Sequence, residues 1–142
     1  MEASTHKLLE LVKEFEERAL SSDELFSQNF EIKDHPIVEA STNKIPKSGT
    51  LSYGKELVKY QFHGNGCKLT FHDGGVVDFN YKPGEWKHDG FSVYAIRDYI
   101  VSKGVEGWDK SRLKSNLDQL VRSDVLYLPD QKYDRYRLRT TS

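Results

Sequence analysis

Apolar and polar residues alternate along most of the segment from residue 57 to residue 82, and two glycine-containing breaks divide it. An alternation with a period of two is typical of strands with one buried face, because successive side chains of a strand point to opposite faces of a sheet. Gly64-Asn65 fits a two-residue type II′ turn, which pairs Phe62 with Cys67 across the hairpin. The segment therefore predicts an antiparallel three-stranded meander.

The second break is Asp73-Gly74-Gly75, and a three-residue loop there keeps every apolar residue on one face. The predicted rows of buried residues are Val58-Phe71-Val77, Tyr60-Leu69-Phe79 and Phe62-Cys67-Tyr81. Cys67 is then a core residue and not a nucleophile. The opposite face is polar, and it carries His63 and Asp78 on different rows.

Helical periodicity precedes the meander. Apolar residues recur every three or four positions over residues 6–20, which predicts an amphipathic helix. The sequence Ser21-Ser22-Asp23-Glu24 is a typical start for a short second helix. Residues 30–54 contain two prolines and two glycines, and we expect an ordered loop there with room for one short strand.

After the meander, Asp89 stands where an N-cap is expected, and Gly104 marks the end of the helix that follows. A second helix is predicted over residues 110–123. A hairpin follows, with strands at 125–128 and 133–138. Two helices and a hairpin in this order are typical of a winged helix.

A chain of 142 residues fits one compact domain, and we assign residues 1–142 to a single α+β domain with residues 89–142 as a helix-helix-hairpin subregion. A single cysteine cannot form a disulfide within the chain. No apolar segment follows Met1, and no run is long enough to span a bilayer. We expect a soluble cytoplasmic protein without a membrane partner.

His63, next to two glycines, is one candidate for contact with a ligand or partner, and Asp78 is another because it could orient an imidazole or accept a proton. Each also has an ordinary structural interpretation. A histidine at the end of a strand can bond to a loop, and Asp78 can pair across the sheet with Lys59 and Thr70.

His88 and Asp89 are candidates at the predicted helix N-terminus, where backbone N–H groups favour an anion, although Asp89 is most simply a cap. Trp86 completes the set of partner-contact candidates. The five histidines show no i,i+4 helical pair and no nearby cysteine, so we expect neither a metal nor another cofactor.

The winged-helix outline raises nucleic-acid binding, with helix 110–123 as the reading helix. Residues 108–142 carry eight lysines and arginines against five aspartates, whereas residues 1–107 carry 13 against 17 acidic residues. The basic excess near the C-terminus is small and is diluted by those aspartates, which argues against nucleic acid as a partner.

The motifs His63-Gly64-Asn65-Gly66-Cys67, Val77-Asp78-Phe79 and Asp89-Gly90-Phe91 together resemble an uncharacterised bacterial domain family of small cytoplasmic proteins. Some members of that family lie beside polymorphic toxin genes and look like immunity proteins. The resemblance covers residues 57–100, and it departs from the family at Asn80 and Ser92, where acidic residues are expected. These departures favour binding over shared carboxylate chemistry.

The resemblance implies an immunity-type protein that binds and neutralises a cognate toxin or effector by direct protein contact. Small size, abundant tyrosine and an acidic body that could face a basic partner agree with this hypothesis. Two alternatives stay open: a small-ligand binder or enzyme that uses His63 with Asp78 or Asp89, and a winged-helix nucleic-acid binder.

Overall fold

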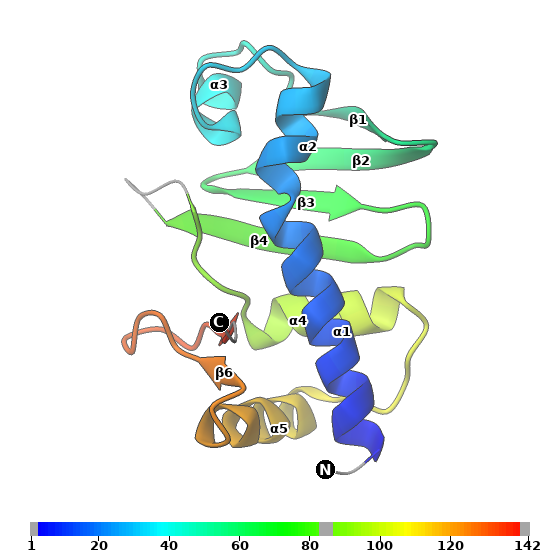
Figure 1. Cartoon of the computed structure of the whole chain (residues 1–142), viewed down its shortest axis with the longest axis vertical. Coiled ribbons are helices and arrows are strands. Elements are labelled where there is room, and N and C mark those ends of the chain that lie inside the picture. Colours follow the sequence, from blue (N-terminus) through cyan, green and yellow to red (C-terminus); the bar gives the residue numbers. More distant parts are fainter. Residues whose placement is uncertain (1–2, 83–86, 140–142) are drawn as a thin grey trace.

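The computed structural model describes residues 3–82 and 87–139 of the chain. It has an N-terminal helix, an antiparallel sheet, further helices and a C-terminal hairpin, which confirms the α+β class (Figure 1). The helices are α1 (Ala3–Leu20), α2 (Ser22–Asn29), α3 (Pro36–Ser41), α4 (Val93–Ser102) and α5 (Lys110–Arg122). The strands are β1 (Ser48–Tyr53), β2 (Glu56–His63), β3 (Gly66–Thr70), β4 (Val76–Lys82), β5 (Lys87–His88), β6 (Leu126–Tyr127) and β7 (Arg137–Leu138).

The main sheet has five strands in the order β1-β2-β3-β4-β5, and not the three predicted. The difference arises partly in residues 30–54, where the one short strand that the sequence allowed is β1 and pairs with β2, and where α3 was not predicted. His35 caps α3 by accepting a hydrogen bond from the Ile37 N–H, and Pro36 occupies the first turn, where a missing N–H costs nothing. Gly54, at φ +63°, permits the tight connection from β1 to β2.

The first hairpin has the predicted register, with Phe62 opposite Cys67. The second is shifted by two residues, because Leu69 lies opposite Val77 and not opposite Phe79. The loop has three residues as predicted, but it begins one position earlier, at His72. Its closing hydrogen bond runs from the Phe71 N–H to the Gly75 carbonyl. A shift of two preserves the face of every side chain, so the predicted core residues are buried except Phe62, which is half-buried, and only the β4 members of the predicted rows are wrong.

The apolar stripe of α1 is buried as predicted, and its members are Leu8, Leu11, Val12, Phe15 and Ala19. The Phe15 ring makes edge contacts with Phe91 and Tyr99, which joins α1 to the segment around α4. In Figure 1, α1 and α2 cross one face of the sheet, and α4 lies beside β4. The core therefore lies between the sheet and these helices.

The cap of α4 differs from the prediction. Ser92, and not Asp89, is the N-cap, and its hydroxyl accepts a hydrogen bond from the Ala95 N–H. Asp89 lies before the start of the helix, because β5 (residues 87–88) and the isolated bridge between Phe91 and Tyr136 come first in the chain. Gly104 follows the helix at φ +79°, as expected for a stop signal.

The helix after it begins with Asp109 as N-cap, which accepts a hydrogen bond of 2.8 Å from the Arg112 N–H. The C-terminal hairpin is present, but its strands are shorter than predicted, with two residues each. Residues 128–136 form a long connection, and Tyr136 pairs with Phe91 and not with the other strand of the hairpin. This pairing holds the hairpin loop near the end of β4.

Candidate functional site

One face of the main sheet is polar and faces away from α1 and α2; we call it the open face. Its side chains, exposed or half-buried, are Thr50, Lys59, Gln61, His63, Lys68, Thr70, Asp78 and Asn80. The alternation predicted this composition, because each strand places every second residue on the open face.

His63 and Asp78 are in direct contact on the open face, with 2.7 Å between Nε2 and Oδ1. They lie on neighbouring rows and meet diagonally, which long side chains can do. The register explains the contact. Asp78 lies opposite Lys68 and not in the predicted row of Lys59 and Thr70, so it is two residues closer to His63 than predicted. This pair is a histidine oriented by a carboxylate.

Gly66 makes that arrangement possible. A Cβ atom at this position would lie 2.6 Å from His63 Cε1, 2.4 Å from the Asn80 side-chain amide and 2.7 Å from the Phe79 carbonyl oxygen. No side chain fits there without displacing backbone. The His63 ring and the Asn80 amide therefore fill the space above Gly66.

A second polar contact continues along β4. With its amide oriented by hydrogen bonding, Asn80 accepts bonds of 2.9 and 3.1 Å from the Arg135 guanidinium. Arg135 Nη1 also lies 3.4 Å from Asp89 Oδ1. Burial raises the pKa of the Asp89 carboxyl, and the charge of Arg135 only partly opposes this. Asp89 is thus an ion-pair partner of the hairpin loop and not a helix cap.

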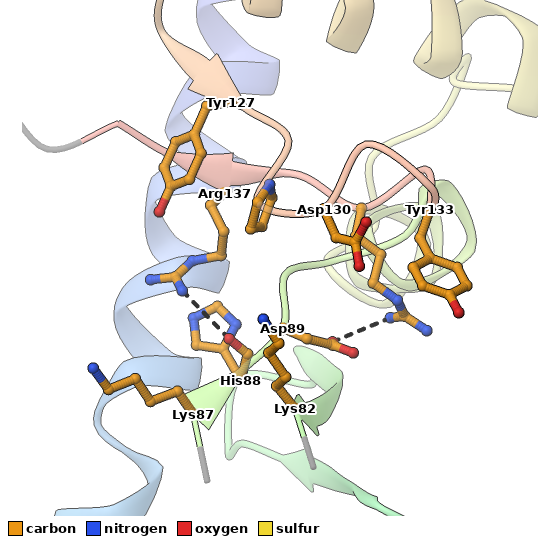
Figure 2. Close-up of a pocket in the computed structure, with 10 residues that line it drawn as sticks. Lys82, Lys87, His88, Asp89, Tyr127, Asp130, Tyr133 and Arg137 are labelled. Atoms are coloured by element: carbon orange, nitrogen blue, oxygen red, sulfur yellow. Dashed lines mark hydrogen bonds and ion pairs between the residues drawn. The ribbon is translucent and has the colours of Figure 1, made fainter. Parts of the chain in front are cut away.

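A cavity of about 520 Å³ lies between the β4 and β5 strands and the C-terminal hairpin; we call it the hairpin pocket (Figure 2). Its lining is rich in cations and tyrosines and comprises Lys82, Lys87, His88, Asp89, Tyr127, Pro129, Asp130, Tyr133, Arg135 and Arg137. Tyr133 is 60% exposed at the rim. Tyrosine and arginine are the side chains most enriched in protein–protein hot spots.

His88 occupies an interior position, which corrects its prediction as an anion ligand at a helix N-terminus. Its Nδ1 accepts a hydrogen bond of 3.3 Å from the Gly90 N–H, and its Nε2 lies 3.5 Å from Glu16 Oε1. Since Nδ1 is an acceptor, Nε2 carries the proton and points toward the carboxylate. Arg137 Nε donates to the same oxygen at 2.6 Å.

Glu16 was not among the residues selected from the sequence. Burial acts to raise the pKa of its carboxyl, but the hydrogen bonds from His88 and Arg137, together with the charge of Arg137, outweigh burial and lower it. A signal was available, because Glu16 follows Val12 by four positions and precedes Ala19 by three, which places a carboxylate on the apolar face of α1. An acidic residue on such a face requires a buried partner.

Trp86 lies outside the described residues. The Cys67 thiol is buried, and burial raises its pKa, which suits a core residue. Within residues 3–82 and 87–139, no group of three or more His, Cys, Asp or Glu side chains could hold a metal ion.

The open face and the hairpin pocket both lie within residues 8–138, which match a family model described as "Domain of unknown function (DUF6896)". The chain belongs to this family. No curated protein and no solved structure matches it. The DUF6896 match extends from α1 through β7, so it includes every element that builds the two features. In the part of the chain that the structure describes, no helix of this DUF6896 protein is both long and apolar enough to cross a membrane.

Proposed function

We propose that this DUF6896 protein is an immunity-type protein that neutralises a cognate toxin or effector by direct contact. The observation that carries the proposal is the open face: a polar sheet surface turned away from the helices, continuous through Asn80 and Arg135 with a pocket lined by tyrosine and arginine. Tyrosine and arginine are enriched in protein–protein hot spots, and the rim around such residues is usually polar, so this combination suits a protein interface. The resemblance of the sequence motifs supports the same proposal.

The chemistry of the described residues favours binding over catalysis. The one cysteine is buried, and burial raises the pKa of its thiol, so it is protonated and unsuited to act as a nucleophile. Asp89 is engaged by Arg135. Side chains held in place by such contacts present a preorganised surface for recognition.

The test begins with a tagged chain purified gently from its native cells, followed by mass spectrometry of any protein that accompanies it. We expect a stoichiometric partner that is harmful when expressed alone and harmless when co-expressed with this chain. Tyr133→Ala together with Arg135→Glu should then abolish protection, whereas Lys13→Glu, on the exposed side of α1, should preserve it. Protection that survives surface changes throughout the open face and the pocket would exclude the proposal.

A second candidate, a small-ligand binder or enzyme, is favoured by the 2.7 Å contact between His63 and Asp78. A carboxylate that holds one imidazole nitrogen leaves the other available as a base or ligand donor. This candidate predicts that a bound small molecule is lost in His63→Ala, while the thermal unfolding temperature changes little. Unaltered binding in that variant would eliminate it.

A winged-helix nucleic-acid binder is the weakest of the three proposals. Two basic residues of α5, the reading helix in this proposal, are engaged within the protein: Lys114 contacts Asp118 and Tyr136, and Arg112 stacks on Trp108. On the hairpin, Arg137 is bonded to Glu16. DNA binding with a steep salt dependence would revive this proposal.

A further inference from the structure

The two edges of the main sheet differ in how they are covered. At the β4 side, α4 packs beside the strand, the Val76 N–H donates to Ser102 Oγ at 2.9 Å, and β5 pairs with the strand's end. On the outer side of β1, by contrast, no further strand is paired within the described residues. β1 is therefore the open edge of the sheet.

Three hydrogen bonds fix which backbone groups of this edge point outward. The Phe62 N–H donates to the Lys47 carbonyl at 2.8 Å, so the backbone groups of Lys47 point toward β2. Ser52 faces the other way, because its N–H donates to Asn29 Oδ1 at 2.7 Å and its carbonyl accepts from Asn29 Nδ2 at 3.0 Å. The backbone groups of an antiparallel strand alternate in direction with a period of two. The N–H and C=O groups of Ser48 and Thr50 therefore also point outward, away from β2.

The Asn29 amide thus occupies the edge at Ser52 as a neighbouring strand would, and the stretch from Ser48 to Thr50 is left exposed. Edge strands are usually protected by charged side chains, proline or bulges. β1, with the sequence Ser-Gly-Thr-Leu-Ser-Tyr, carries no charge and no proline. Its middle is a template on which another extended segment can pair.

A hollow of about 470 Å³ lies beside this edge. Lys59 and Lys68 line it together with Thr50 and Thr70, and none of its lining residues is acidic. A strand added to β1 would place every second side chain on the open face, next to this hollow. The charge of the hollow favours an acidic side chain at that position.

We propose that β1 binds an extended acidic segment of the partner protein, which adds a sixth strand through the backbone of Ser48 and Thr50 and directs a carboxylate toward Lys59 and Lys68. A second copy of this chain fits less well, because β1 has no acidic residue to offer to the lysines of the other copy. The identity of the partner rests on the proposed function. The binding of an acidic strand at β1 is argued from the edge itself and is independent of the proposed function.

The first test uses a defined probe, a capped six-residue peptide in which glutamate alternates with valine, followed by backbone ¹⁵N NMR of the full chain. We expect the amide signals of Ser48 and Thr50 to shift during titration. The affinity should fall at least tenfold in Lys59→Glu/Lys68→Glu and for the same peptide with lysine in place of glutamate. Lys13→Glu is the matched control. Equal binding of the acidic and basic peptides, or no shift at β1, would overturn the proposal.

The second test separates the backbone contribution. Thr50→Pro removes an outward N–H, whereas Thr50→Val retains it, so only the first should weaken binding of the acidic peptide. A peptide N-methylated along one edge provides the same comparison without changing the protein. If a purified cognate partner binds Thr50→Pro and the lysine variants as well as wild type, the edge proposal fails while the proposed function stands. If no protein partner is found, the proposed function fails and the peptide titration still decides the edge.

Discussion

Glu16 and Arg137 are 121 positions apart in the chain, and Arg137 Nε donates a hydrogen bond of 2.6 Å to Glu16 Oε1. The Glu16 side chain is only 4% exposed. This contact connects the first helix to the last strand, and the same strand borders the hairpin pocket. The interior side of the pocket is therefore held by one buried ion pair.

Arg137→Met should consequently destabilise the protein by about 3–5 kcal/mol, because it leaves the Glu16 carboxylate buried without its main partner. Replacing both residues, as Glu16→Leu with Arg137→Met, should cost less than the single change. Arg139→Met, which removes only a cation lying 5.3 Å from the Tyr127 ring, is the control and should cost less than about 1 kcal/mol. Urea unfolding measures all three, and an Arg137→Met variant as stable as the control would refute the argument.

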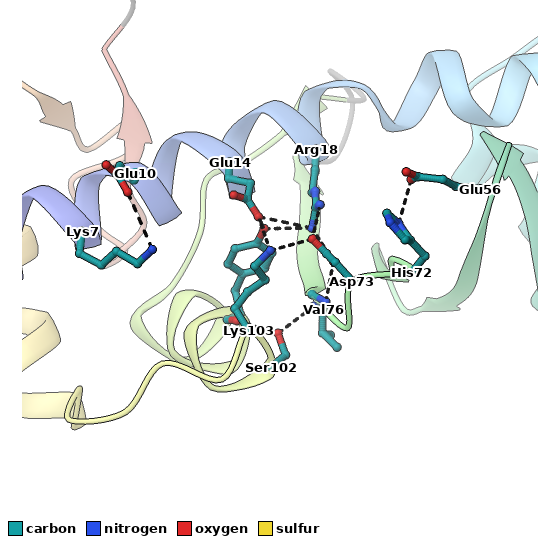
Figure 3. Close-up of polar contacts among 12 residues, drawn as sticks. Lys7, Glu10, Glu14, Arg18, Glu56, His72, Asp73, Val76, Ser102 and Lys103 are labelled. Atoms are coloured by element: carbon teal, nitrogen blue, oxygen red, sulfur yellow. Dashed lines mark hydrogen bonds and ion pairs between the residues drawn. The ribbon is translucent and has the colours of Figure 1, made fainter. Parts of the chain in front are cut away.

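Asp73 joins the second hairpin to two helices, as Figure 3 shows. Its carboxylate receives Arg18 Nη2 at 2.6 Å from α1, and it receives Lys103 Nζ at 2.7 Å from the end of α4. The hydrogen bond from Arg18 is the main reason that the pKa of Asp73 lies well below its ordinary value. Asp73→Asn should therefore cost about 1–3 kcal/mol at neutral pH.

The sign of the pH dependence follows from that lowered pKa. The stability that Asp73 contributes is complete above the pKa of an unfolded aspartate, about 3.9, and it is lost as the pH falls toward the folded value. The difference between wild type and Asp73→Asn should be constant from pH 7 to about pH 5 and shrink below about pH 4. Glu10→Gln, which removes an exposed pair at 3.9 Å, should show little difference at any pH. A difference that grows in acid would contradict this assignment.

Gly66→Ala should destabilise the protein by about 1–3 kcal/mol, because the new methyl group would press on the Phe79 carbonyl as well as on His63 and Asn80. It should also separate His63 from Asp78, which imidazole NMR signals can detect. Gly54→Asn is the control. That glycine is at φ +63° with nothing within 4 Å of an added Cβ, and asparagine tolerates this conformation. If both changes cost the same, crowding above Gly66 is not the cause.

The sequence predicted much of this structure where one physical rule dominates. Alternation separated the buried from the polar face of β2 to β4, and helical periodicity identified the buried stripe of α1. Prediction from the sequence failed where two different structures satisfy the same rule. Starting the second loop at His72 or at Asp73 buries the same residues, so hydrophobic pattern cannot choose between them. The Asp73 side chain, which accepts a hydrogen bond from the Gly75 N–H, is among the contacts of the observed loop.

The same limit applies to the candidate site. His63 and Asp78 were selected from the sequence, but their contact depends on the two-residue shift and could not be derived without it. Asp89 and His88 were assigned to a helix N-terminus because β5 is only two residues long and leaves little pattern. Their true partners, Arg135 and Glu16, are distant in sequence, and only tertiary packing brings them together.

The role of Asn29 at the sheet edge can be tested without a partner protein. Asn29→Ala removes both hydrogen bonds to Ser52, together with the bond from Asn29 Nδ2 to the Leu25 carbonyl. The expected cost is about 1–2 kcal/mol, because the freed backbone groups of Ser52 become accessible to water. The amide of Ser52 should exchange with deuterium faster than in wild type.

Gln28→Ala is the matched control, because it removes only an exposed contact of 3.3 Å with Glu24 on the same helix. It should leave exchange at Ser52 unchanged. Thr50 provides the internal comparison: its outward N–H has no cap to lose, so its exchange should already be fast in wild type and should not respond to either substitution. Slow exchange at Thr50 in the wild-type protein would mean that the edge is covered, and it would remove the basis for strand addition at β1.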